Sequence, residues 1–174
     1  MPIAMSPTRE KYPLSFKKIL KKTISEAIGW MIISAVIFPI ASWSIYIVGY
    51  RNPILKQLST IIIGTLCLTA LIVVIIYFYQ KWYFETYFYN LTDFHIVIRK
   101  SPLTPREITI PYERIQDVYV DQDLLDRVFG LYDVHLSSAT STSGLEAHID
   151  GVEKSAADGL RTELLQKIQE KKRG

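Results

Sequence analysis

Two uncharged, apolar stretches decide the fold of this chain: Ala27–Tyr50, AIGWMIISAVIFPIASWSIYIVGY, and Gln57–Gln80, QLSTIIIGTLCLTALIVVIIYFYQ. A helix needs about 20 predominantly apolar residues to cross the hydrocarbon core of a bilayer. Both stretches are longer than that, and only the short segment Arg51–Lys56 separates them. The sequence therefore predicts a transmembrane helical hairpin over residues 23–80.

Basic residues are concentrated before the first apolar stretch. They are Arg9, Lys11, Lys17, Lys18, Lys21 and Lys22, whereas the segment between the stretches carries two. Cytoplasmic flanks of membrane helices carry the excess of Lys and Arg. This distribution predicts a multi-pass protein of the plasma membrane with both termini in the cytoplasm. The predicted parts are a basic cytoplasmic segment over 1–22, the hairpin over 23–80 and a cytoplasmic domain over 81–174.

The basic segment itself contains few structural signals. Three prolines lie in residues 1–14, which we expect to be unstructured. In residues 15–22, apolar side chains share one face with lysines beside them. Such a basic amphipathic turn is expected to lie on the cytoplasmic leaflet.

The rest of the chain alternates between apolar and polar residues, the pattern typical of β-strands. Strands are predicted at 83–89, 94–99, 107–110, 117–121, 133–138 and 145–150. Asp123–Phe129 is predicted to be a short helix that Asp123 caps and Gly130 ends. An apolar stripe over residues 157–168 predicts an amphipathic C-terminal helix. The predicted core is Ile110, Ile115, Val118, Val134, Leu136, Leu160 and Leu164.

Three segments carry a resemblance to a known family. They are Ile110–Val118 (IPYERIQDV), Leu124–Leu131 (LLDRVFGL) and Ile149–Val152 (IDGV). The sequence resembles the membrane-anchored bacterial pleckstrin-homology-like proteins, in which a helical hairpin precedes the domain. The resemblance implies a membrane hairpin plus an α+β domain, with a curled antiparallel sheet or barrel of six or seven strands capped by a C-terminal helix. It also implies a binding or regulatory role, and members are linked to envelope stress and to resistance or immunity to antimicrobial peptides.

Two groups of residues are candidates for contact with lipid or a partner. Arg99, Lys100 and Arg106 gather at one end of a predicted strand pair, where they could contact anionic lipid or simply remain solvated. Leu124, Leu125 and Phe129 belong to the short helix. One helical face cannot bury all of its apolar residues. Part of this surface is therefore expected to face the bilayer or a partner, with Asp126 and Arg127 in water; complete burial in the core is the alternative.

A hairpin centred on Ser141–Thr142 would place His135 opposite His148 and Asp133 opposite Asp150. Two imidazoles and two carboxylates could bind Zn²⁺ or another divalent ion, or form a pH-sensitive surface patch. A register slip of one residue would destroy this set. The sequence contains no nucleophile elbow, phosphate-binding glycine loop or CxxC pair. We therefore predict no enzyme activity, no cofactor and no nucleic-acid partner.

These observations favour a non-enzymatic, membrane-tethered module that binds a protein or peptide at the cytoplasmic face. The bilayer is the other predicted partner, and a second copy of the chain is a further candidate. The alternative hypothesis is an accessory subunit of an export or resistance transporter, whose hairpin packs within the membrane complex. The two hypotheses differ in whether the domain or the hairpin carries the activity.

Overall fold

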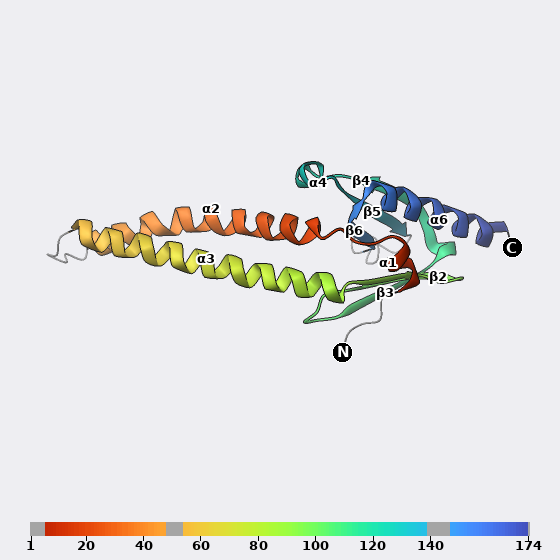
Figure 1. The fold of residues 1–174 in the computed structure, drawn as a ribbon, viewed down its shortest axis with the longest axis horizontal. Helices are drawn as coiled ribbons and strands as arrows, with labels where there is room; N and C mark the ends of the chain where they lie inside the picture. The colour runs from red at the N-terminus through yellow and green to blue at the C-terminus, as the bar shows by residue number, and fades with distance from the viewer. Residues whose placement is uncertain (1–5, 48–53, 139–146, 174) are drawn as a thin grey trace. The chain divides into compact units, whose positions relative to one another are not determined.

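The chain is described by a computed structural model over residues 6–47, 54–138 and 147–173 (Figure 1). It divides into two compact units. One comprises residues 22–80, and the other combines residues 1–21 with residues 81–174. The second unit, called the domain below, therefore contains the segment that precedes the first apolar stretch.

Two long helices form the unit of residues 22–80. They belong to α2 (Lys17–Ile47) and α3 (Ile54–Thr86). The side-chain amide of Gln80 donates a hydrogen bond of 2.6 Å to Glu26 Oε1 and joins the helices. Within the part of the chain that the structure describes, one helix, Ile62–Thr86, is long and apolar enough to cross a membrane. The membrane crossing of the first stretch, the multi-pass topology and the orientation of the termini remain predictions.

The domain contains two three-stranded antiparallel sheets (Figure 1). The first has the order β1–β2–β3 and the second the order β4–β5–β6. Among the described strands none pairs across the two sheets, so the predicted barrel is not closed. The strand bounds are β1 Phe88–Leu91, β2 His95–Lys100, β3 Arg106–Pro111, β4 Ile115–Asp121, β5 Leu131–Ser138 and β6 His148–Glu153, with a 3₁₀ turn, η1, at Tyr112–Arg114.

The C-terminal helix α6 (Lys154–Arg173) packs on the second sheet and on η1. Its apolar stripe faces the sheet, as the helical periodicity predicts, because Ala157, Leu160 and Leu164 are fully buried. All seven predicted core residues are buried, with exposures between 0% and 3%. The core prediction is therefore confirmed, as is the α+β fold with a C-terminal helix.

One predicted strand is wrong. Residues Tyr83–Thr86 continue α3, and β1 begins only at Phe88. The run of aromatic residues has a high strand propensity. Helix formation prevails because each residue added to an existing helix gains one backbone hydrogen bond without a new nucleation cost.

Residues 6–14 of the N-terminal segment are folded, contrary to expectation. Ser6 caps α1 (Pro7–Lys11) by accepting a hydrogen bond from the backbone of Arg9, and Pro7 occupies the first helical position. The buried guanidinium of Arg9 donates to the carbonyls of Phe84 at 2.9 Å and Tyr87 at 2.5 Å. These carbonyls lie where α3 passes into β1, so α1 satisfies backbone groups that this junction leaves open.

Lys18 and Lys21 do not lie on a leaflet surface as predicted, because both are buried in the domain. Lys18 Nζ lies 2.9 Å from Asp150 Oδ1 and 4.0 Å from the centre of the Tyr87 ring. The aliphatic part of the Lys18 side chain packs directly against Gly151, where an added Cβ would lie 2.6 Å from Lys18 Cδ. Gly151 has φ +78°, so glycine suits both the backbone and the close approach.

Candidate functional site

The short helix α4 (Leu124–Phe129) joins the two strands β4 and β5. Asp123 and Asp126 form a capping box, in which Asp123 Oδ1 accepts from the Asp126 backbone at 2.7 Å. Gly130 ends the helix in the left-handed conformation with φ +67°. Both predicted caps are confirmed.

Two apolar side chains of α4 face away from the protein. Leu124 is 82% exposed and Val128 is 77% exposed. Residues four apart are neighbours on a helix surface, so the two form one apolar ridge. Leu125 and Phe129 are half-buried, which makes them supporting residues rather than the centre of this surface. Val128 belongs to the apolar surface of the short helix that was expected to be partly exposed, but it was not among the named contact candidates; its spacing from Leu124 is the signal that identifies it.

Lys21 fixes α4 to the domain. Its Nζ lies 2.5 Å from Asp126 Oδ1 and 3.0 Å from Asp123 Oδ2. Asp126 is completely buried, so the prediction that it stays in water is wrong. Burial by itself lowers the pKa of Lys21, but the hydrogen bonds to Asp126 and Asp123 outweigh burial and raise it. The apolar ridge therefore lies on a capped helix that a buried ion pair joins to Lys21 of α2.

The three basic candidates do not form one open cationic surface. Arg99 makes hydrogen bonds of 2.9 Å and 2.6 Å to the carboxylate of Glu107 on the neighbouring strand. Lys100 is half-buried opposite Arg106, and its Nζ lies 5.7 Å from the centre of the Tyr87 ring. Arg106 is exposed. Contact of these residues with anionic lipid remains a prediction.

The two histidines lie opposite each other, as the hairpin register predicts. His135 of β5 pairs with His148 of β6, and their rings stack with centres 5.2 Å apart. The register shifts between Tyr132 and Val134, so Asp133 does not lie opposite Asp150 as predicted. Asp133 Oδ1 instead accepts a hydrogen bond of 2.7 Å from the Gly151 backbone. Because Asp150 pairs with Lys18, the predicted four-ligand set is divided.

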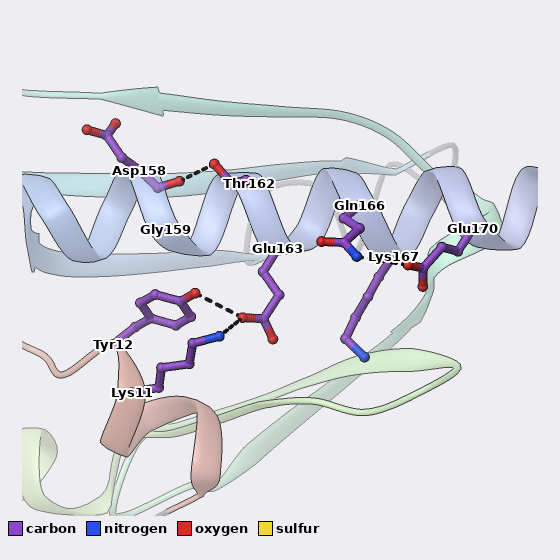
Figure 2. A pocket seen from close by; sticks show the side chains of 9 residues that line it. All are labelled: Lys11, Tyr12, Asp158, Gly159, Thr162, Glu163, Gln166, Lys167 and Glu170. Carbon is purple, nitrogen blue, oxygen red and sulfur yellow. Dashed lines mark hydrogen bonds and ion pairs between the residues drawn. The ribbon is translucent and has the colours of Figure 1, made fainter.

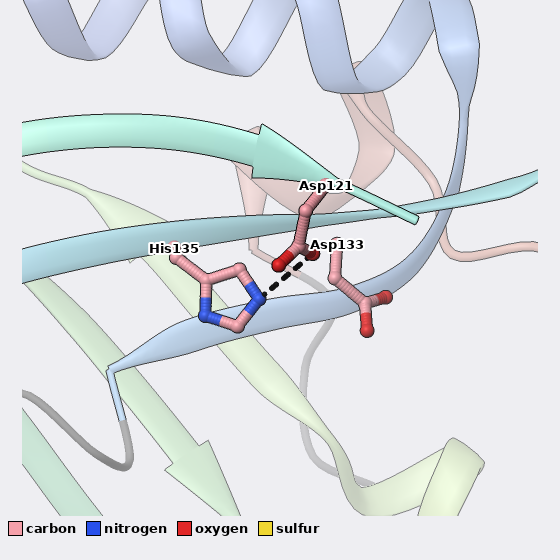
Figure 3. A group of neighbouring side chains, drawn as sticks. All are labelled: Asp121, Asp133 and His135. Atoms are coloured by element: carbon pink, nitrogen blue, oxygen red, sulfur yellow. Dashed lines mark hydrogen bonds and ion pairs between the residues drawn. The ribbon is translucent and has the colours of Figure 1, made fainter. Parts of the chain in front are cut away.

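Asp121, and not Asp150 as predicted, is the second carboxylate close to Asp133 and His135. It lies at the end of β4, opposite Asp133, and forms a cluster with Asp133 and His135 (Figure 3). His135 Nε2 lies 3.1 Å from Asp121 Oδ1. The sequence does contain a signal for Asp121. In the alternating pattern of β4, Asp121 lies on the same face as Tyr119, which stacks on His135.

His148 predicts a measurable pH dependence of stability. Burial is the main cause that lowers its pKa to about 4, and the nearby charge of Lys100 adds to it. The unfolded chain, with an ordinary histidine pKa near 6.5, then binds the proton first as the pH falls. The folded state should lose stability between about pH 6.5 and 4. We expect a loss of about 1–2 kcal/mol, since the ring is only partly buried and solvent screens the effect.

Unfolding free energies measured in metal-free buffer at several pH values test this expectation. His148→Gln should flatten the profile in that window. An identical slope in wild type and His148→Gln would show that His148 is not the titrating group.

A polar pocket of about 550 Å³ lies between α1 and α6 (Figure 2). Glu163 Oε2 lies at its side and accepts hydrogen bonds from Lys11 at 2.6 Å and Tyr12 at 2.9 Å. Partial burial raises the pKa of Glu163, but these two donors outweigh it and lower the pKa. Lys11 and Glu163 at the pocket are thus paired with each other, and the lining residue Lys167 lies 3.7 Å from Asp93, which makes the pocket a weaker binding candidate than α4. The sequence does not indicate this pocket, because residues 1–14, which supply one side of it, were expected to be unstructured.

Comparisons with known proteins agree with this architecture. A family model described as "Bacterial PH domain" matches residues 18–168. The match begins at the buried Lys18 and ends in α6, so it covers nearly all of α2, then α3, α4, both sheets and most of the C-terminal helix. No curated protein and no solved structure matches the chain significantly.

Proposed function

We propose that this chain, which belongs to the bacterial PH domain family, is a non-enzymatic module that binds a protein or peptide partner at the cytoplasmic face of the plasma membrane. The apolar hairpin of residues 23–80 tethers it there with both termini in the cytoplasm. The family supports a binding role, because binding is what PH-like domains generally do. The resemblance to membrane-anchored members suggests envelope stress or antimicrobial-peptide resistance as the physiological setting.

The exposed ridge of Leu124 and Val128 is the observation that carries this proposal. Single exposed apolar residues are common on protein surfaces. Here two adjacent ones project from a six-residue helix whose ends are capped and whose buried carboxylate pairs with Lys21. Such a rigid arrangement lowers the ordering cost of association. The exposed Arg127 and the mostly exposed Asp123 flank the ridge, so a partner should offer an apolar pocket with polar groups at its rim.

A substitution at the ridge tests the proposal. Leu124→Glu should weaken binding of the native partner at least about tenfold, because a carboxylate would be buried in an apolar contact. The full chain carrying the substitution would be used to capture partners from native membranes in detergent, with each captured protein quantified by mass spectrometry.

Leu103→Glu is the matched control, since Leu103 is 66% exposed and lies outside α4. It should leave capture unchanged. Equal capture by wild type and a folded Leu124→Glu variant would place the binding surface elsewhere, first at the sheet edges. Loss of the fold in Leu124→Glu would contradict the exposure of this residue.

An accessory role of the hairpin in a transporter complex is the second candidate. One observation favours it: an apolar pocket of about 230 Å³ lies between the two helices, lined by residues that include Trp30, Ile37, Leu68 and Ile72. Replacing residues 24–79 with an unrelated two-helix hairpin separates the two roles. Partner capture should persist if the domain carries the activity, and it should be lost if the hairpin does.

A further inference from the structure

Two carboxylates face each other across neighbouring strands at the start and end of the segment that carries α4. Asp121 is the last residue of β4, and its partner in the antiparallel register is Asp133 of β5. Directly opposed residues have Cβ atoms about 4.5–5.5 Å apart, and like charges in such positions are destabilising. Asp133 is also largely buried, with 17% side-chain exposure. The pair therefore has a local excess of negative charge that a cation would relieve.

His135 adds a nitrogen ligand held in a fixed orientation. Its ring is stacked against Tyr119, with centres 4.9 Å apart and an interplanar angle of 4°. It also stacks with His148, at 5.2 Å and 21°. These contacts direct Nε2 toward Asp121 Oδ1, 3.1 Å away, which is close to the separation of two ligands on one metal ion (Figure 3).

The Asp133 carboxylate is positioned by the β-bulge. One oxygen, Oδ1, accepts the 2.7 Å hydrogen bond from the Gly151 backbone, and the other, Oδ2, lies 4.0 Å from Lys21 Nζ, beyond hydrogen-bond distance. Outer contacts of this kind orient the ligands of metal sites. One ligand atom from each of Asp121, Asp133 and His135 lies within 4.8 Å of the other two.

We propose that Asp121, Asp133 and His135 bind one divalent transition-metal ion, of which Zn²⁺ is the best match. One imidazole nitrogen and two carboxylate oxygens suit Zn²⁺, which accepts three protein ligands and keeps a fourth position for water. The side chain of Asp121 is 56% exposed, so the ion has a route from solvent. Small closing movements of this exposed carboxylate would bring the ligand atoms to bonding distance.

Lys21 is the cation that could compete for this position. Its Nζ lies 4.0 Å from Asp133 Oδ2 but 2.5 Å from Asp126 Oδ1 and 3.0 Å from Asp123 Oδ2. The lysine is thus engaged mainly with the two α4 carboxylates. Asp121 lies directly opposite Asp133 in the register, and His135 lies two residues further along β5, so a metal ion held by the three would join β4 to β5.

A bound metal ion would link the two ends of the segment that carries the apolar ridge. The ion would join the end of β4 to β5 on either side of α4 (Leu124–Phe129). Any ligand that binds the folded state alone stabilises that state. The site does not depend on the partner-binding role of α4, so either inference can fail without the other.

Isothermal titration calorimetry with ZnCl₂ tests the site. The sample is the full, tag-free chain in detergent, stripped of metal with EDTA. We expect one Zn²⁺ per chain. Asp121→Asn and His135→Gln should each weaken binding at least about tenfold, because each removes one of three ligands. Far-UV circular dichroism of the metal-free variants checks that both fold.

Two substitutions outside the cluster serve as matched controls. His95→Gln removes a half-buried strand histidine in β2, and Asp117→Asn removes an exposed strand carboxylate in β4. Both should keep the wild-type affinity for Zn²⁺. Absence of binding by the wild type overturns the proposal, as does equal affinity in wild type and both site variants. Binding that appears only in Lys21→Met would show that the lysine fills the position, and this result also overturns it.

Discussion

Replacing Lys21 with alanine should lower the free energy of unfolding of the domain by about 3–5 kcal/mol. The side chain of Lys21 is only 5% exposed and that of Asp126 only 1% exposed, with 2.5 Å between Lys21 Nζ and Asp126 Oδ1. Removing the lysine leaves a buried carboxylate without its cation, which costs more than the ion pair itself contributes. Amide hydrogen exchange in β4, β5 and β6, measured on the full chain in detergent under increasing urea, provides the unfolding free energy.

Lys17→Ala is the control for general loss of positive charge. Lys17 is more than half exposed, and its Nζ lies 3.9 Å from Glu153, so its removal should change stability by less than about 1 kcal/mol. The double variant Lys21→Ala with Asp126→Asn should recover part of the loss, because it also removes the unpaired charge. Equal effects of Lys17→Ala and Lys21→Ala would contradict the buried ion pair.

The elements with a strong local pattern were predictable from the sequence. Helix α6 follows from the spacing of Leu160 and Leu164, and α4 follows from Asp123 and Gly130, because these residues satisfy the requirements of a helix face and of its two ends. The pairing of His135 with His148 also follows from strand alternation around a central turn. Each of these features depends on residues that are close in sequence.

The features that were missed depend on contacts between distant segments. Lysines before a membrane helix are normally explained by topology. Nothing local in the sequence indicates that Lys18 meets Asp150 or that Lys21 meets Asp126. The bulge at Gly151 likewise has no distinct local signature, yet it separates Asp150 from Asp133 and lets Asp121 complete the cluster.

These long-range contacts give the segment before the first apolar stretch a structural role. Arg9, Lys18 and Lys21 account for three of its six basic residues, and all three are buried in the domain. A topology prediction that counts all six as free positive charges therefore includes three that are buried in the domain. The same residues join α1 and the start of α2 to the fold, so a truncated domain that begins at residue 81 would lack part of its core.

Replacing Leu164 with alanine should lower the free energy of unfolding by about 2–5 kcal/mol. Leu164 is fully buried where α6 packs on β4 and β5, and its truncation would leave a cavity that the sheets can only partly fill. Leu165→Ala is the matched control on the same helix, because Leu165 is 36% exposed and should cost far less. Hydrogen exchange under urea measures both variants. A change below about 0.5 kcal/mol for Leu164→Ala would mean that α6 does not belong to the core, and the architecture described for the domain would then be wrong.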